Sequence, residues 1–212
     1  MNEEFWHEKW AKNEIGFHEK DGNRLLSEHL HQLALQPGQR ILLPLCGKTR
    51  DIARLLAQGY QVVGIELSEL AIEQLFEELE IKAKIAQAGE LSIYSADSID
   101  IFVGNIFSVD ENTLGHVDAI YDRAALVALP EVLRMEYVDH LARIAHQAAQ
   151  LLITFEYDQK AMDGPPFSIT QAAIKQYYGD AYQIEHIASE AVSGKLKGLV
   201  EASEDVWLLK PR

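Results

Sequence analysis

Residues 40–66 constrain the fold of this chain more than any other stretch, because strand, loop, helix, strand and acid follow one another without a gap. The apolar run Ile41–Leu43 predicts a short strand that is buried on both faces. The segment Pro44–Arg50 predicts a loop around Gly47, and Asp51 is an acceptor that can cap the next helix. The sequence therefore predicts a strand that runs through a glycine loop into a helix.

The residues that follow complete one half of a mononucleotide-binding unit. The predicted helix Ile52–Gln58 ends at Gly59, and Gln61–Ile65 predicts a second strand. Glu66 stands at the C-terminal edge of that strand, about 20 residues past the glycine loop, where such folds hold a ribose. Glu66 is therefore a candidate ribose ligand; the alternative is a solvated glutamate beside a purely structural turn.

The glycine loop is poorly equipped to bind phosphate. A dinucleotide fold requires G-x-G-x-x-G, whereas this loop has only Gly47, and Pro44 donates no amide. S-adenosylmethionine has a ribose, an adenine and a charged amino-acid tail but no phosphate. The carbonyl oxygens of Leu45–Gly47 suit its ammonium group, and Glu66 suits its ribose. An S-adenosylmethionine site is thus the central hypothesis, and the missing glycines speak against the rival, a nicotinamide-dependent oxidoreductase.

Composition narrows the class of protein. The chain has 212 residues, enough for one domain with a sizeable core, and we expect a monomer. Its net charge of −14 argues against nucleic acid and against an anionic membrane as partners. A single cysteine excludes an internal disulfide and fits the cytoplasm. The acidic, amphipathic N-terminus does not resemble a signal peptide, and no apolar run is long enough to span a bilayer.

The residues before the first strand predict two helices, Glu3–Asn13 and Asn23–Leu35. Trp6 and Trp10 lie four residues apart and share a helix face. They either pack in a core or form a lid over a cofactor, since aromatic faces suit a sulfonium cation. Phe17 is either a core residue or a flat surface for a ring substrate. We therefore treat residues 1–36 as a helical lid on a core of residues 37–212.

The middle of the chain predicts a helix from Ser68 to Leu79, an irregular insert at Ile81–Glu90, and a hairpin. The hairpin strands are Leu91–Tyr94 and Ile99–Val103. Asn105 and Ile106 follow the second arm, at a strand end that faces the same crevice as Glu66 in a doubly wound sheet. Asn105 could bond an adenine edge and Ile106 could pack on its ring; an ordinary Gly-Asn turn is the alternative.

Arg123 follows the predicted strand Val117–Tyr121 in a very acidic protein. Its guanidinium suits a bidentate pair with the methionine carboxylate of the cofactor, or with Asp122 or another neighbour. The remaining predicted elements are a helix from Pro130 to Ala149, a strand, a helix and two last strands, in the order Leu151–Phe155, Thr170–Tyr178, Tyr182–Ala188 and Val206–Leu209. The fold class is therefore α/β, a mostly parallel sheet with helices on both faces and an antiparallel last strand.

Other chemistry has little support in the sequence. No P-loop motif is complete, and no histidine spacing resembles a zinc site, so no metal is expected. Cys46 lies in the glycine loop without an identified histidine partner, which disfavours a nucleophile. Asp21, Asp122 and Asp158 are acids near the expected crevice, but nothing in the sequence selects one as a base.

Several specific strings together resemble the thiopurine S-methyltransferase family, in its compact bacterial form. P-L-C-G-K and D-R-x-A-L-V-A are far more specific than a generic glycine loop, and the resemblance covers nearly the whole chain. The strings are Trp6 with Trp10, Gly16–His18, Pro44–Lys48, Val63–Glu66, Asp122–Ala128 and Gly164–Phe167.

The resemblance implies a Rossmann-like class I methyltransferase that uses S-adenosylmethionine. It implies cofactor contacts from Trp10, the Leu45 backbone, Glu66 and Arg123, with Trp6 helping to close the lid. It also places Asn105 and Ile106 at the adenine and Phe17 beside the substrate.

The expected reaction is direct displacement at the methyl carbon by the sulfur of a small aromatic or heterocyclic thiol. Because a heteroaryl thiol ionises readily, no catalytic base is named, and Phe17 and Phe167 could sandwich the ring. The alternatives are methylation of selenium or other metalloid compounds, and a module that binds S-adenosylmethionine without turnover.

Overall fold

A single mixed sheet organises the part of the chain that the computed structural model describes, residues 3–212. The sheet order is β3-β4-β5-β2-β1-β6-β7-β9-β8. The strands are β1 (Arg40–Pro44), β2 (Gln61–Glu66), β3 (Lys84–Ala88), β4 (Leu91–Ala96), β5 (Ile99–Val103), β6 (Ala119–Arg123), β7 (Ala149–Tyr157), β8 (Tyr182–Ala191) and β9 (Ala202–Pro211). The five central strands, from β5 to β7, are parallel, and antiparallel pairs extend the sheet at both edges.

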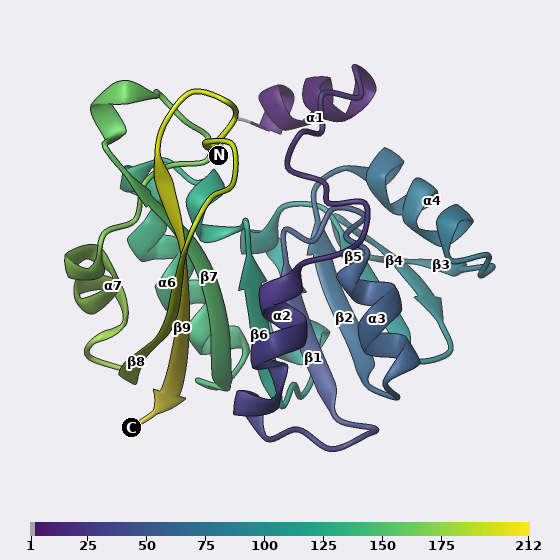
Figure 1. Ribbon diagram of the computed structural model, residues 1–212. Coiled ribbons are helices and arrows are strands. Elements are labelled where there is room, and N and C mark those ends of the chain that lie inside the picture. The colour runs from purple at the N-terminus through teal and green to yellow at the C-terminus, as the bar shows by residue number, and fades with distance from the viewer. Residues whose placement is uncertain (1–2) are drawn as a thin grey trace.

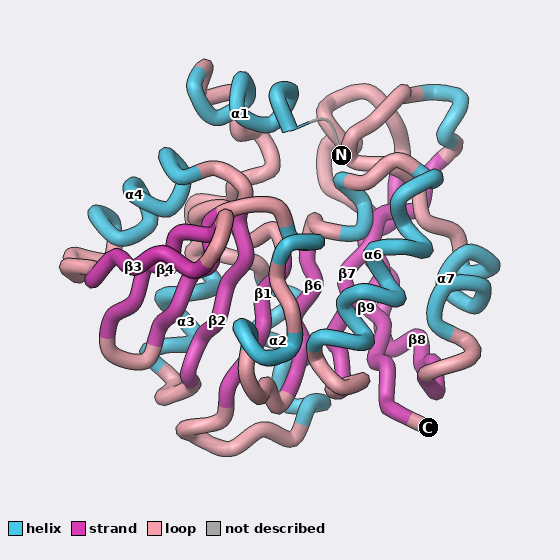
Figure 2. The backbone as a smooth tube through the Cα atoms, turned by 180° about the vertical axis from the view of Figure 1, so that it is seen from behind, coloured by secondary structure: helices cyan, strands magenta, loops and turns pink. Residues whose placement is uncertain are grey.

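Helices cover both faces of this sheet, as Figures 1 and 2 show from opposite sides. They are α1 (Glu3–Ala11), α2 (Arg24–His29), α3 (Asp51–Ala57), α4 (Glu69–Glu78), α5 (Glu111–Leu114), α6 (Glu131–Ile144) and α7 (Gln171–Tyr178). Side chains of α2, α3 and α4 pack on one face, and those of α5, α6 and α7 pack on the other. The predicted fold class, including the antiparallel last strand, is confirmed.

The strand β1 is the centre of this arrangement. Leu42 belongs to the core on one face of the sheet, while Ile41 and Leu43 belong to the core on the other. All three are at most 2% exposed. Successive side chains of a strand point to opposite faces, so a continuous apolar run fits a strand that is covered on both sides.

The parallel strands end at one edge of the sheet, and several segments gather over it. Figure 1 shows α1 above this edge, with the β8–β9 connection (residues 192–201, yellow) reaching toward the same region. Ligands of open α/β sheets bind outside the carboxyl ends of the strands. We therefore expect a ligand site between the edge of the sheet and these two segments.

The predicted insert at Ile81–Glu90 is wrong, because residues 84–88 form β3 at the edge of the sheet, antiparallel to β4. Four of the five β3 residues are exposed. An edge strand that is exposed on both faces has no alternating pattern of apolar residues, and so its sequence gives no strand signal.

Other boundaries shift by a few residues. The helix predicted over 23–35 is α2 followed by a 3-10 turn, Leu30–Leu33, and Asn23 caps it. The helix predicted to reach Ala149 ends at Ile144, which leaves Ala149 as the first residue of β7. Arg123 is the last residue of β6 rather than a residue beyond the strand.

None of the helices that residues 3–212 form has the length and apolar character that a bilayer crossing requires.

Candidate functional site

A cavity of about 680 Å³ lies at the carboxyl edge of the parallel strands. Its walls come from α1 and the segment that follows it, the β1–α3 loop, the ends of β2 and β6, residues 164–166 and the β8–β9 connection. A volume of this size is typical of a small-molecule site. Of the predicted site residues, Trp6, Trp10, Phe17, Leu45, Glu66 and Arg123 line it, whereas Asn105 and Ile106 do not.

Glu66 is held firmly on the wall of the cavity. One carboxylate oxygen accepts a hydrogen bond from Gly47 N at 2.8 Å, and the other accepts one from Ser68 N at 2.8 Å. The residue is 6% exposed, and burial raises the pKa of its carboxyl against the opposing effect of these donors. Each oxygen keeps acceptor capacity, so the carboxylate is fixed in place and still able to accept from a diol.

The β1–α3 loop adopts an unusual backbone beside this carboxylate. Leu45 has φ of 47° and Gly47 has φ of 52°, both in the left-handed region. Cys46 N donates to Ile65 O at 3.1 Å, which ties the loop to β2. Burial raises the pKa of the Cys46 thiol well above its usual value, so this cysteine is a poor nucleophile at neutral pH.

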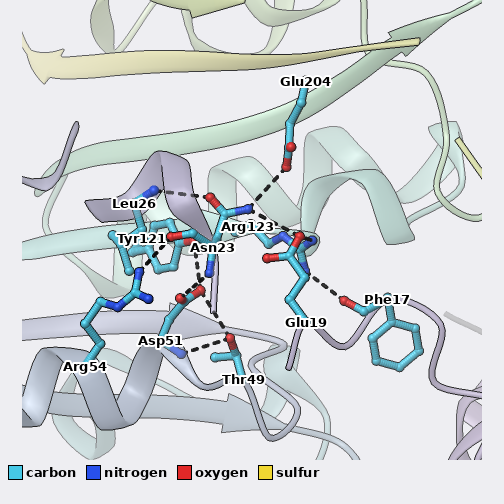
Figure 3. A network of polar contacts seen from close by, with 10 residues as sticks. All are labelled: Phe17, Glu19, Asn23, Leu26, Thr49, Asp51, Arg54, Tyr121, Arg123 and Glu204. Atoms are coloured by element: carbon cyan, nitrogen blue, oxygen red, sulfur yellow. Dashed lines mark hydrogen bonds and ion pairs between the residues drawn. The ribbon is translucent and has the colours of Figure 1, made fainter. Parts of the chain in front are cut away.

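The prediction that Asp51 caps α3 is wrong. Asp51 is the first residue of the helix, and Arg50, which precedes it, makes no side-chain capping hydrogen bond. Its buried carboxylate instead accepts from Asn23 N at 2.7 Å, from the Tyr121 hydroxyl at 3.1 Å and from the Thr49 hydroxyl at 3.1 Å. Figure 3 shows how this one acid joins the N-terminal segment, the glycine loop and β6.

Arg123 is bound by the N-terminal segment and not by its sequence neighbour Asp122. It donates to Phe17 O at 2.9 Å and to the Glu19 carboxylate at 2.5 Å (Figure 3). Its Nε is buried and has no hydrogen-bond partner within residues 3–212. A buried N–H that lacks an acceptor is costly, and an anionic group of a ligand would satisfy it.

Aromatic side chains roof the cavity above the glycine loop. Phe17 makes edge contacts with Trp6 at 5.8 Å and with Trp10 at 5.6 Å between ring centroids. Trp10 is 4% exposed and lies against Gly47, where an added Cβ would come within 3.0 Å of its ring. Trp6 and Trp10 thus fit both interpretations: their rings pack against Phe17, and they also line the cavity.

Asn105 and Ile106 follow β5 at the same edge of the sheet, where Gly104 N donates to Glu66 O at 2.9 Å. The Asn105 amide donates to Glu3 at 2.7 Å, and its oxygen accepts from Phe107 N at 2.9 Å. Ile106 is fully buried in the core, so its side chain does not lie where a ring could pack on it. Contact of Ile106 with a ligand is thus restricted to its backbone.

The acids singled out from the sequence lie outside the cavity lining. Asp122 is buried and accepts from the Tyr137 hydroxyl and Leu126 N, while Asp158 caps a short 3-10 turn. Asp21 offers its backbone oxygen to Arg54. The three acids that the sequence places near the expected crevice therefore do not line the cavity.

Three acids that the sequence analysis missed do line the cavity, Glu14, Glu19 and Glu204. Glu204 lies on β9, and Asn23 donates to it at 3.4 Å. Burial raises the pKa of the Glu204 carboxyl, and the nearby Arg123 opposes that shift. Their sequence signal was weak, because glutamates are common in this acidic chain and only the fold brings these to one cavity.

The loop at Gly164–Phe167 contributes only its first three residues to the lining. The Phe167 ring lies 5.3 Å from the Arg134 guanidinium, and its backbone N donates to Val127 O. The prediction that Phe167 faces a substrate ring is therefore wrong. Phe155 of β7 lines the cavity instead. Within residues 3–212, no group of three His, Cys, Asp or Glu side chains is placed to hold a metal ion.

Comparison with known proteins connects this geometry to a family. The family model described as thiopurine S-methyltransferase matches residues 1–212. A thiopurine S-methyltransferase of Teredinibacter turnerae is 48% identical over 209 residues, which cover 99% of this chain and 97% of the relative. One of Xanthobacter autotrophicus is 47% identical over 211 residues, covering 99% of each chain.

Solved structures with much lower identity share the fold. An S-adenosylmethionine-dependent methyltransferase of Anabaena variabilis has a TM-score of 0.69 at 17% identity, covering 99% of this chain and 95% of its own. A 1,6-didemethyltoxoflavin-N1-methyltransferase of Burkholderia thailandensis, solved with S-adenosylhomocysteine, has a TM-score of 0.67 at 14% identity, covering 98% and 87%. These likenesses support the Rossmann-like methyltransferase architecture.

Proposed function

The chain belongs to the thiopurine S-methyltransferase family, and we propose that it transfers the methyl group of S-adenosylmethionine to the sulfur of small aromatic or heterocyclic thiols, thiopurines among them. The observation that carries this proposal is the Glu66 carboxylate, fixed by two backbone N–H groups in a cavity that Arg123, whose buried Nε lacks a partner within residues 3–212, also lines. The two groups match a sugar diol and a carboxylate, which are distant parts of one ligand.

The residues present fit this cofactor. Glu66 accepts from the ribose hydroxyls, the Leu45 backbone contacts the amino-acid tail, and Arg123 binds its carboxylate. Trp10 and Trp6 roof the cofactor. At the other end, Asn105 contacts the adenine edge with the Ile106 backbone beside it, which requires the Asn105 amide to exchange its bond with Glu3. S-adenosylmethionine supplies a methyl group that is already activated by its sulfonium.

The acceptor occupies the more apolar end of the cavity. Phe17 and Phe155 offer flat surfaces there, and Pro165 and Pro166 add a wall whose main chain has no N–H to satisfy. These side chains hold a ring and keep water away from its sulfur. Positioning of this kind supplies about 7–11 kcal/mol of the barrier in well-oriented reactions, so the chain can act without a dedicated base.

We also propose that residues 1–212 form one domain, with residues 1–36 as a lid, of which Met1 and Asn2 lie outside the described residues. A monomer that works in the cytoplasm without nucleic-acid or membrane partners fits the net charge of −14 and the single cysteine. Size-exclusion chromatography with light scattering tests the monomer directly: a mass near twice the 23.9 kDa of one chain would contradict it.

A methyl-transfer assay with labelled S-adenosylmethionine tests the activity. The panel consists of aromatic thiols, aliphatic thiols and selenium compounds. We expect the highest rate of transfer with aromatic thiols. A higher rate with selenium compounds would indicate that methylation of metalloid compounds is the main activity. Binding of S-adenosylmethionine without transfer to any acceptor would overturn the proposal in favour of a binding module.

A further inference from the structure

Four cationic side chains line the cavity, and three of them are neutralised by a carboxylate. The ion pairs are Lys9 with Glu14 at 2.5 Å, Lys48 with Glu78 at 2.8 Å, and Arg123 with Glu19 at 2.5 Å. Lys197 is the fourth. Its ammonium donates to the carbonyl of Pro165 at 2.5 Å, and it makes no ion pair within residues 3–212.

The β8–β9 connection places this lysine. Leu196, the preceding residue, is 8% exposed and packs in a small apolar cluster with Tyr157, Met162 and Val200. Backbone hydrogen bonds between Leu196 and Val200 close the turn. Lys197 lies in the exposed turn that this pairing closes, and the buried Leu196 beside it anchors its backbone.

Lys197 is an exposed residue that lines the cavity, and no carboxylate among residues 3–212 balances its charge. Partial burial lowers the pKa of its ammonium, and Lys9, which faces it from α1, lowers it further. Val192, Leu196 and Phe155, which also line the cavity, offer no charge to balance it. A neutral carbonyl is a weak partner for an ammonium, whereas an anion in the cavity would be a strong one.

We propose that Lys197 is the counter-ion of the methyl acceptor, so that this site takes ring-bearing acceptors as thiolates and not as neutral thiols. The proposal rests on the function proposed above. The thiol loses its proton to water before it binds, and Lys197 holds the anionic sulfur. Methylation makes that sulfur a neutral thioether, which no longer attracts the ammonium, and product release follows from the same contact.

The acceptor and its product differ in charge at the sulfur, and that difference provides the test. 4-Nitrobenzenethiol is a thiolate at neutral pH because its nitro group withdraws charge, and 4-nitrophenyl methyl sulfide is its neutral product. We would titrate each by calorimetry into protein saturated with S-adenosylhomocysteine, which prevents turnover. The variants are Lys197→Met, Lys197→Arg and a matched control, Lys195→Met, whose lysine pairs with Glu201 at 3.6 Å and does not line the cavity.

Lys197→Met should weaken thiolate binding on the order of tenfold, as expected for loss of a charged hydrogen bond. It should leave thioether binding unchanged, which also shows that the variant is folded. Lys197→Arg should restore most of the thiolate affinity, and Lys195→Met should behave as the wild type. Equal weakening of both ligands, or of neither, would overturn the inference.

The same titrations keep this inference apart from the proposed function. Wild-type protein that fails to bind S-adenosylhomocysteine, or that methylates no thiol, refutes the proposed function itself. If the wild type binds S-adenosylhomocysteine and methylates aromatic thiols while Lys197→Met binds the thiolate and the thioether as the wild type does, only the role of Lys197 is refuted.

Discussion

Arg123 and Glu19, which both line the cavity, are joined by a hydrogen bond of 2.5 Å that connects the end of β6 to the segment after α1 (Figure 3). Arg123 also donates to Phe17 O in the same segment. One guanidinium therefore fastens the N-terminal segment to the sheet, and its buried Nε lacks a partner within residues 3–212. We therefore expect both cofactor binding and the attachment of the lid, residues 1–36, to depend on the Arg123 side chain.

Arg123→Ala should raise the dissociation constant for S-adenosylhomocysteine at least tenfold, because a charged hydrogen bond to the ligand carboxylate is lost. Its melting temperature should fall as well, since Phe17 and Glu19 lose their donor. Calorimetric titration and thermal unfolding measure the two effects separately.

Glu19→Gln is the matched control for this prediction. It breaks the same ion pair but keeps the guanidinium, so the melting temperature should fall while cofactor affinity stays close to that of the wild type. If Arg123→Ala lowers only the melting temperature, Arg123 is a structural residue and its assignment to the cofactor is wrong.

The acid that pairs with Arg123 could not be predicted from the sequence. Glu19 and Arg123 are 104 residues apart, and a sequence pattern does not tell which distant acid will meet a given cation. Glu204 is a similar case, since only the pairing of β9 with β7 brings it to the cavity. By contrast, the unit from β1 to Glu66 could be predicted because its parts are consecutive and each has a local signal.

Exposure or tertiary contacts explain the other predictions that were wrong. β3 could not be predicted because four of its five residues are exposed and its stability comes from backbone pairing with β4. Asp51 is a residue type that often caps helices, yet here its buried carboxylate accepts from Asn23 N and the Tyr121 hydroxyl. Phe167 was predicted to contact a substrate ring, but it contacts Arg134 and does not line the cavity. In each case a tertiary contact outweighed a local preference.

Glu66→Ala should raise the dissociation constant for S-adenosylhomocysteine at least tenfold, through loss of charged hydrogen bonds to the ribose. The substitution also leaves Gly47 N and Ser68 N without their acceptor, so thermal stability should fall. Glu69→Ala is the control, because Glu69 accepts from the Tyr94 hydroxyl and does not line the cavity. A calorimetric titration that is the same for Glu66→Ala and the wild type would contradict the ribose assignment.

Asp122 should make stability depend on pH. Burial raises the pKa of its carboxyl from 3.8 to about 6, although Tyr137 and Leu126 donate to it. Because the folded state binds this proton more tightly, the resulting stabilisation is fully present below a pH of 3.8 and is lost as the pH rises through about 6. The shift corresponds to a free energy on the order of 3 kcal/mol.

Asp122→Asn removes this titration. Unfolding free energies measured in urea between about pH 4 and about pH 7 should therefore fall more steeply with pH for the wild type than for the variant. Asp97→Asn, on the exposed β4–β5 turn, should follow the wild-type curve. Parallel curves for the wild type and Asp122→Asn would mean that the folded protein does not hold the Asp122 proton.

Gly47→Ala should disturb the roof of the cavity through Trp10. Gly47 has φ of 52°, which costs a residue with a Cβ roughly 1–2 kcal/mol, and the new Cβ would lie 3.0 Å from the Trp10 ring. Trp10 must then move, so cofactor affinity should fall and tryptophan emission should change. Gly38→Ala is a close control, because its φ of +87° carries the same backbone cost while nothing lies within 4 Å of its added Cβ. If both variants lose stability and neither loses affinity, contact of Trp10 with the glycine loop does not matter for the cofactor.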